Sequence, residues 1–332
     1  GCIMNASPLE GTNAMNAISL RPARPESDFS RLAAWFTILE GETNTEESLT
    51  RYFERDRDRI LRVMVAEESA GTPLGFSWLE RSRANPDRAV LSLYVLPEHR
   101  RQGIGSRLYA DLEQAARELV ADRLRVSIWD NAPADRGFAE RRGFAEHIHS
   151  MAFSLDLATF DDRPYDAIIE RLKAEGFHFT SMEELGNTEE AQRRLYILND
   201  TAAASTLGSD GEHPWESFED FQQHVCQADW YKPGGQFVAI DTATGKWAAM
   251  SAITRLEGND YAYNLFTGVD FPYRGRKLAQ AVKVHALRYA RDVLKATSVH
   301  TNHNSKNPPI LAIDRKLGYV QIPGLYVMEK AL

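Results

Sequence analysis

An internal repeat at an offset of 174 residues constrains this chain more than any other feature. Residues 95–105 and 269–279 both read as a strand end, a turn and a glycine-rich loop. Each loop leads into an amphipathic helix and then a short strand. Each copy ends on a glycine followed by an aromatic residue, Gly143-Phe144 and Gly318-Tyr319. Four landmarks in the same order and spacing indicate a duplicated unit.

The chain has 332 residues, which is comfortable for two domains. We expect an α+β (mixed α/β) fold, in which each domain has a central, mostly antiparallel sheet flanked by helices. The Asp161-Asp162-Arg163-Pro164 turn is the expected boundary. The predicted domains are therefore 17–158 and 162–332, and residues 1–16 are expected to be a disordered tail or a cloning remnant. The alternating stretch 150–157 is interpreted as the closing strand of the first domain.

Local patterns predict the remaining elements. Alternating or apolar stretches predict strands at 18–20, 63–66, 74–80, 89–95, 124–128, 237–240, 247–254, 261–269 and 298–301. Helical periodicity predicts helices at 28–39, 45–55, 164–175 and 188–203.

Composition limits the classes of function. The net charge of -8 disfavours nucleic-acid binding, which needs a basic face. Only two cysteines, Cys2 and Cys226, are present, and this is the usage expected of a reducing cytoplasm. No apolar run reaches the length of a membrane span. We therefore expect a cytoplasmic monomer or homodimer without nucleic-acid or membrane partners.

The loop from Arg100 to Ser106 carries the chemistry. Gly103 and Gly105 remove side chains where backbone N–H groups converge, and the following helix adds the positive end of its dipole. The arrangement suits a pyrophosphate, and Arg100 and Arg101 add charge. A tight strand–helix turn without a ligand is the alternative from this loop alone. The third glycine of a dinucleotide site and the Gly-Lys-Ser/Thr of a P-loop are both absent.

These residues resemble a known family. Arg100-x-x-Gly103-x-Gly105 resembles motif A of the GNAT superfamily of acyl-CoA N-acyltransferases. Asn131-x-x-Ala134 with Gly143-Phe144 is similar to the family's motif B. The second half resembles the C-terminal repeat of tandem GNAT proteins, a group that includes the mycothiol synthases. The resemblance extends from Ile18 to Lys330.

The resemblance implies an N-acetyltransferase that uses acetyl-CoA as co-substrate, needs no metal, and acetylates a primary amine of a small molecule by direct attack. Backbone N–H groups at a splayed strand would stabilise the oxyanion. The implied coenzyme-binding residues of the first copy are Leu93, Tyr94, Val95, Arg100, Arg101, Gln102, Gly103, Ile104, Gly105, Ser106 and Asn131. Those of the second copy are Thr267, Gly268, Val269, Arg274, Gly275, Arg276, Lys277, Leu278, Ala279 and Gln280.

The chain departs from the family where protons move. Phe138 and Ile313 occupy the places of the tyrosine that often protonates the leaving thiolate. Ala89 and Tyr263 occupy the places of the usual basic glutamate. Lys277 replaces a loop glycine and requires a permissive backbone angle. These departures leave open a non-catalytic acyl-CoA sensor or pseudoenzyme as the alternative function.

We expect the second half to be catalytic, with Tyr263 and Asn302 as its catalytic residues. Polar side chains near the centre of a sheet are costly unless they are paired or used. Simple hydrogen bonding between these residues is the open alternative. His300 and His303 lie close by in a polar stretch; they lack the further ligands of a metal site, and we interpret them as surface histidines.

Overall fold

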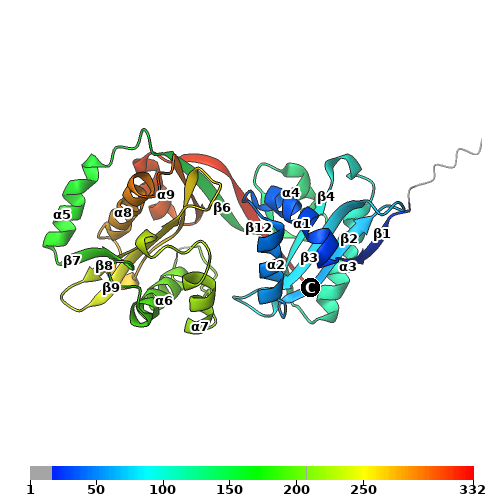
Figure 1. Cartoon of the computed structure of the whole chain (residues 1–332), viewed down its shortest axis with the longest axis horizontal. Coiled ribbons are helices and arrows are strands. Elements are labelled where there is room, and N and C mark those ends of the chain that lie inside the picture. Colours follow the sequence, from blue (N-terminus) through cyan, green and yellow to red (C-terminus); the bar gives the residue numbers. More distant parts are fainter. Residues whose placement is uncertain (1–16, 207) are drawn as a thin grey trace, which may run out of the picture. The chain divides into compact units, whose positions relative to one another are not determined.

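A computed structural model of the chain, which describes residues 17–206 and 208–332, contains the same run of elements twice (Figure 1). The first run is β4 (Arg88–Val95), α3 (Ile104–Glu118), β5 (Arg123–Trp129), α4 (Pro133–Glu140) and β6 (Ala145–Asp156). The second run is β10 (Tyr261–Val269), α8 (Leu278–Asp292), β11 (Ser298–Asn304), α9 (Pro308–Leu317) and β12 (Val320–Ala331). Short 3-10 turns precede the two loops, at Pro97–His99 and Phe271–Tyr273. The predicted duplication is confirmed.

The elements that precede these runs agree with the predicted strands and helices. In the first half they are β1 (Ser19–Pro22), α1 (Pro25–Glu40), α2 (Glu46–Arg55), β2 (Ile60–Glu67) and β3 (Pro73–Arg81). In the second half they are α5 (Asp166–Ala174), β7 (Phe177–Ser181), α6 (Glu189–Ala204), α7 (Phe218–Phe221), β8 (Gln236–Asp241) and β9 (Lys246–Thr254). The sequence patterns did not predict β7 or α7.

Internal contacts divide the chain into two units that differ from the sequence repeats. Unit 1 comprises the chain up to Ser82, Asp87–Leu124 and Ala331–Leu332. Unit 2 comprises Arg83–Pro86 and Arg125–Lys330. The domain limits 17–158 and 162–332 therefore remain a prediction about the repeat.

Unit 1 is an antiparallel sheet in the order β1-β2-β3-β4, with helices on both faces. Successive residues of β2 point to opposite faces. Val65 packs against Phe29 and other side chains of α1 and α2. Met64 packs with Ile104 and Leu108 of α3. The second cluster also contains Val95 and holds α3 against the sheet, so the N-terminus of α3 lies next to the end of β4.

Unit 2 has the strand order β5-β12-β6-β11-β10-β9-β8-β7. β10 and β11 run parallel, whereas β6 is antiparallel to both β11 and β12. The interpretation of 150–157 as a strand that closes the first domain is wrong, because both hydrogen-bonded neighbours of β6 come from the second half of the chain. In turn, β12 lies between β5 and β6, so each copy contributes its last strand to its neighbour.

Two equivalent hydrogen bonds mark this exchange of strands. The N–H of Asp130 donates to the carbonyl of Gly324 at 2.9 Å. The N–H of Ser305 donates to the carbonyl of His149 at the same distance. The two bonds are related by the repeat, because each residue of one bond lies 175 residues from its counterpart in the other, the same offset as between Gly143 and Gly318.

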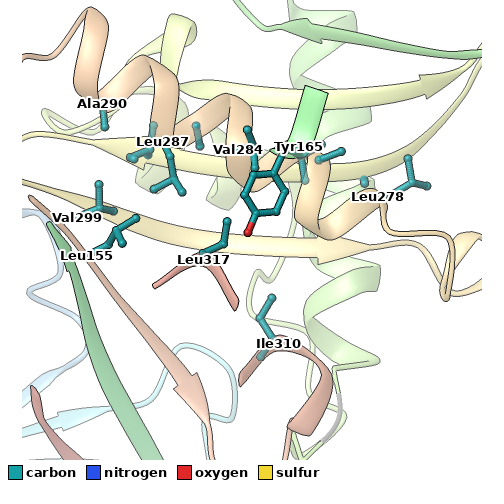
Figure 2. Close-up of a cluster of buried hydrophobic side chains, with 14 of the residues drawn as sticks. Leu155, Tyr165, Leu278, Val284, Leu287, Ala290, Val299, Ile310 and Leu317 are labelled. Atoms are coloured by element: carbon teal, nitrogen blue, oxygen red, sulfur yellow. The ribbon is translucent and has the colours of Figure 1, made fainter. Parts of the chain in front are cut away.

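The core of unit 2 lies on both faces of its sheet. α8 packs its apolar side against β9 and β10, together with side chains of β6, α5 and α9 (Figure 2). Leu155, Val284, Leu287 and Val299 belong to this cluster and are almost fully buried. α6 and α7 cover the opposite face in a second cluster that includes Leu195, Phe221 and Met250.

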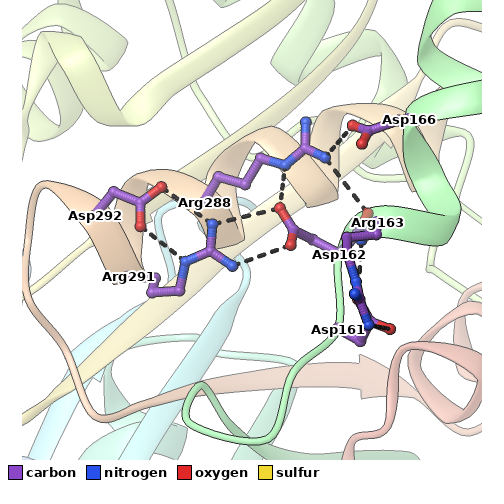
Figure 3. A network of polar contacts seen from close by, with 7 residues as sticks. All are labelled: Asp161, Asp162, Arg163, Asp166, Arg288, Arg291 and Asp292. Carbon is purple, nitrogen blue, oxygen red and sulfur yellow. Dashed lines mark hydrogen bonds and ion pairs between the residues drawn. The ribbon is translucent and has the colours of Figure 1, made fainter.

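Ion pairs attach the predicted domain boundary to α8 (Figure 3). The carboxylate of Asp162 contacts Arg288 at 2.6 Å and Arg291 at 3.2 Å. Burial would raise the pKa of Asp162, but hydrogen bonds from Arg291 and Arg288 lower it on balance. The Asp161–Pro164 segment is therefore held by charge against the helix that follows the second loop.

Candidate functional site

The first loop has the backbone of an anion cradle. Arg101 and Gly103 have left-handed backbone angles, with φ of 64° and 83°. The chain reverses at these two residues and enters α3 with Gly103 as its N-cap. No side chain caps this helix, and the first intrahelical bond runs from the N–H of Arg107 to the carbonyl of Gly103. The first N–H groups of α3 therefore lie at the positive end of the helix dipole.

The second loop repeats this geometry residue for residue. Gly275 and Lys277 have φ of 78° and 68°, at the positions that correspond to Arg101 and Gly103. Lys277 is the N-cap of α8, again without a side-chain cap. The permissive angle expected for Lys277 is confirmed.

One arginine fixes each loop to the strand before it. The Nε of Arg100 donates to the carbonyl of Val95 at 2.9 Å, and the Nε of Arg274 donates to the carbonyl of Val269 at 3.3 Å. In the second copy a terminal nitrogen of Arg274 also donates to Ser205 Oγ at 2.9 Å. Each guanidinium is therefore held at the end of the strand that leads into its loop, and an arginine in this position suits a phosphate.

The other predicted coenzyme-binding residues differ in the solvent exposure of their side chains. In the first loop the exposed residues are Arg101, Gln102, Gly103 and Ser106, and in the second they are Gly275, Arg276 and Lys277. The side chains of Tyr94, Ile104, Leu278 and Gln280 are buried, which leaves their backbone as the part that can face a ligand. Leu93, Val95, Gly105, Thr267, Gly268, Val269 and Ala279 are half-buried or buried along β4, β10 and the starts of α3 and α8. Arg276 is paired with Glu175 at 3.1 Å.

Asn131 is exposed and follows β5. It belongs to unit 2, whereas the first loop belongs to unit 1, so its part in the first coenzyme site stays a prediction. Phe138 carries the Arg142 guanidinium over its ring, and Ile313 packs against the apolar core of unit 2. Neither side chain offers a proton.

The two predicted catalytic residues meet in the second copy. The hydroxyl of Tyr263 on β10 donates to Oδ1 of Asn302 on β11 at 2.8 Å. Nδ2 of Asn302 reaches Ser150 Oγ on β6 at 3.5 Å. The hydrogen bond agrees with the open alternative of mutual pairing, and a catalytic role for the pair stays a prediction.

The strands of the second copy separate just beyond this pair. The pairing of β10 with β11 runs from Tyr261 to Asn264. There β10 also shifts its register against β9, between Asn264 and Phe266. A bulge of this kind bends a strand and leaves backbone groups outside the ladder. The edge of β10 from residue 265 to 269 then leads directly to the second loop.

A buried polar network lies on the α8 side of this separation. Nδ2 of Asn264 donates to Ser251 Oγ at 3.0 Å and to the carbonyl of Ala252 at 2.8 Å. Thr267 Oγ1 contacts Ser251 Oγ at 2.9 Å. Thr301 Oγ1 donates to the carbonyl of Asn264 at 3.2 Å. These bonds fix the two strands at the point where they part.

Sequence reasoning missed a charged cluster beside this network. Nζ of Lys283 lies 2.8 Å from Oδ1 of Asp314, and Nε2 of His303 lies 2.8 Å from Oδ2 of the same carboxylate. The interpretation of His303 as a surface histidine is wrong, because only 11% of its side chain is exposed. His300 is half-buried and stacks on Tyr261 at 4.1 Å. Lys283 lies on the amphipathic helix predicted after the second loop, and Asp314 lies in a segment for which no helix limits were predicted, so neither residue gave a signal of burial.

Within residues 17–206 and 208–332, no group of three His, Cys, Asp or Glu side chains is arranged to hold a metal ion. In the same part of the chain, no helix is long and apolar enough to cross a bilayer.

Two strand–loop–helix cradles for an anion, each at the end of a mixed α/β sheet, define a tandem acyl-CoA N-acyltransferase fold. Known proteins agree with this class. Residues 29–144 match the acetyltransferase (GNAT) family model. A mycothiol acetyltransferase of Thermobifida fusca is 25% identical over 282 residues, which cover 81% of this chain and 82% of that protein.

Solved structures extend the likeness to the whole chain. A tandem GNAT protein from the clavulanic acid biosynthesis pathway matches with a TM-score of 0.69 and 20% identity, over 95% of this chain and 98% of that one. A GCN5-related N-acetyltransferase from Sphaerobacter thermophilus matches with a TM-score of 0.68 and 16% identity, over 95% of both chains. At such identities the likeness concerns the fold alone. The family match identifies a GNAT acetyltransferase domain in residues 29–144, and the likeness to solved structures extends the tandem GNAT fold over the rest of the chain.

Proposed function

We propose that the protein transfers an acetyl group from acetyl-CoA to a primary amine of a small molecule, and that the second copy performs the reaction. The observation that carries the proposal is the duplicated cradle, in which two left-handed residues and an uncapped helix recur at each loop. The coenzyme pyrophosphate is the group that best suits such a cradle.

The residues of the second copy have distinct tasks in this reaction. Arg274 and the N–H groups at the start of α8 would hold the pyrophosphate. The free edge of β10 beyond Asn264 would pair with the pantetheine amides. Backbone N–H groups at the bulge would polarise the thioester carbonyl and stabilise the oxyanion when the amine attacks. Holding both reactants in place supplies much of the rate.

Polar side chains beside the separation of β10 and β11 favour the second copy as the catalytic one. Tyr263, Asn302 and Ser150 form a hydrogen-bonded row next to the separation of β10 and β11. In the first copy, Ala89 stands where Tyr263 stands in the second and offers no polar side chain. We assign a coenzyme-binding role to the first loop and acetyl transfer to the second.

Turnover of acetyl-CoA with a panel of small amines tests the proposal. The relatives are mycothiol acetyltransferases, so the panel includes deacetylated mycothiol beside amino sugars, amino acids and polyamines. We expect release of coenzyme A that depends on one class of amine. Binding of acetyl-CoA without turnover of any amine would contradict the proposal and favour the sensor alternative.

A further inference from the structure

The strongest unexplained feature of unit 2 is the charged cluster of Lys283 on α8, His303 on β11 and Asp314 on α9. Lys283 and Asp314 are fully buried. The Lys283 Nζ also lies 3.4 Å from Nε2 of His303 and 5.3 Å from the centre of the Tyr319 ring. Burying charges is expensive even when they are paired, so a cluster of this kind needs a reason.

The fold does not require the cluster. The corresponding residues of the first copy are Tyr109, Ile128, Ala139 and Phe144, and all four are buried without a charged group among them. The equivalent helices and strand of the first copy therefore form with uncharged residues at these four positions. The charges of the second copy are a specific property of that copy.

The position of the cluster connects it with the reaction. His303 lies two residues beyond Thr301, the last residue of β11 paired with β10, and so at the separation of the two strands. Thr301 Oγ1 lies 3.5 Å from the imidazole, which joins the cluster to the network that fixes this separation. Asp314 directly follows Ile313, which stands where the family often has its proton-donating tyrosine.

The imidazole is prepared to accept a proton. Burial lowers the pKa of His303 below its ordinary value, so the ring is neutral near pH 7. Nε2 faces a carboxylate and is assigned the proton, and Nδ1 then keeps its lone pair. The side chain keeps 11% of its surface exposed, so the ring is not fully closed off from solvent.

We propose that His303, positioned by Asp314 and Lys283, moves the proton of acetyl transfer in the second copy. The inference rests on the proposed function. The amine nitrogen attacks the thioester carbonyl carbon, the C–S bond breaks, and sulfur leaves with the electron pair. The proton that nitrogen loses passes to Nδ1 of His303 and from there to the thiolate, so an amide and free coenzyme A are formed and the imidazole returns to its neutral state. Asp314 and Lys283 are positioning residues, whereas His303 is the catalytic residue.

The first test replaces His303 by glutamine, which keeps a polar side chain but cannot titrate. We expect His303→Gln to lower kcat by a factor of about 10² to 10⁴, the range of general acid–base catalysis, with acetyl-CoA affinity changed less than twofold by calorimetry. His300→Gln is the matched control on the same strand, and its kcat should stay within twofold of the unmodified protein.

The second test leaves His303 in place and measures kcat/KM as a function of pH. The quantity compared is the pH of the acidic limb of this profile. The titratable groups that face the imidazole are Lys283 from α8 and Asp314 from α9. The Lys283 charge lowers the pKa of His303 and the Asp314 carboxylate raises it. Lys283→Met should therefore move the limb to higher pH, and Asp314→Asn should move it to lower pH. A purely structural cluster would not move the limb in opposite directions.

The outcomes separate this inference from the function beneath it. If the unmodified protein turns over no amine, the proposed function fails and the inference falls with it. If the unmodified protein is active but His303→Gln keeps its kcat and acidic limb, only the inference is overturned. If His303→Gln loses acetyl-CoA binding in parallel with kcat, the inference is also overturned, because His303 would then have a structural role. Should His303→Gln fail to fold, the direction of the Lys283→Met shift decides.

Discussion

Lysine at position 277 occupies a backbone conformation that usually selects glycine. Its φ of 68° matches the 83° of Gly103 in the first copy. The sequence alignment of the repeat was sufficient to predict this angle, because backbone geometry is shared between copies even where the residue differs. Left-handed angles cost a residue with a Cβ about 1–2 kcal/mol. The second loop carries this strain and gains a cation beside the cradle.

The strain at this position is measurable. Lys277→Gly should raise the free energy of unfolding by about 1 kcal/mol, because glycine adopts the angle without strain. Gly103→Ala should lower it by about 1–2 kcal/mol from backbone strain alone, since an added Cβ meets no atom within 4 Å. Denaturant unfolding of both variants checks the pair. Equal stability of the unmodified protein and both variants would contradict the prediction that the left-handed angle is strained.

His285 gives the stability of the protein a pH dependence. The ring stacks on Phe179 and Phe237, and burial lowers its pKa from 6.5 to about 4. The unfolded chain binds a proton below pH 6.5 and the folded chain only near pH 4. Stability is therefore complete above pH 6.5 and falls as the pH drops toward 4, by roughly 3 kcal/mol from this residue.

Replacing this histidine should flatten the curve. His285→Phe keeps an aromatic ring in the stack and removes the titrating group. Urea unfolding at several pH values between 4 and 7 should show a shallower loss of stability for the variant. Slopes that match those of the unmodified protein would show that His285 does not carry the effect.

At the scale of elements, sequence patterns located strands and helices but not their partners. Alternation in 150–157 predicts a strand, and β6 is that strand. Alternation carries no information about which neighbours a strand will pair with, so the exchange of β6 and β12 was not predictable. His303 and Asp314 were missed for a related reason, since their burial depends on three elements that meet only in the folded chain.

The crossing of β6 and β12 requires a glycine. Gly324 lies where the register of the two strands shifts, and a Cβ there would meet the carbonyl oxygen of Ser150 at 2.3 Å. Gly324→Ala should destabilise the protein by about 1–3 kcal/mol, the usual cost of overpacking. Gly137→Ala is the control within α4, where alanine should stabilise the helix by up to about 1 kcal/mol. Thermal unfolding of the two variants in opposite directions is the expected result, and a Gly324→Ala protein as stable as the original would contradict the close approach.

At the scale of the whole molecule, the repeat predicted two copies of one unit but not which strands complete the sheet around each copy. Because β12 lies between β5 and β6, the last strand of the chain completes a part of the sheet that begins with the first copy. The sequence offset revealed duplicated loops, helices and strands. It could not reveal that the contacts would divide the chain near Leu124.

Removal of β12 should therefore affect more than the chain end. A variant that stops after Tyr319 leaves β5 and β6 with open edges that face no strand. We expect loss of a sharp unfolding transition and concentration-dependent self-association, measured by circular dichroism and light scattering. Removal of Ala331 and Leu332 alone is the control and should preserve both properties. A monomeric, cooperatively folded protein without β12 would contradict the strand exchange.

The most direct measurement compares the two loops through one matched pair of charge reversals. Arg100 and Arg274 occupy equivalent positions and make equivalent bonds to their strands. Acetyl-CoA turnover is measured for Arg100→Glu and Arg274→Glu with the best amine of the panel, beside the coenzyme stoichiometry of each variant. If the second copy performs acetyl transfer, Arg274→Glu abolishes turnover and Arg100→Glu retains most of it. Abolished turnover in Arg100→Glu with full activity in Arg274→Glu would contradict this account and assign the reaction to the first copy.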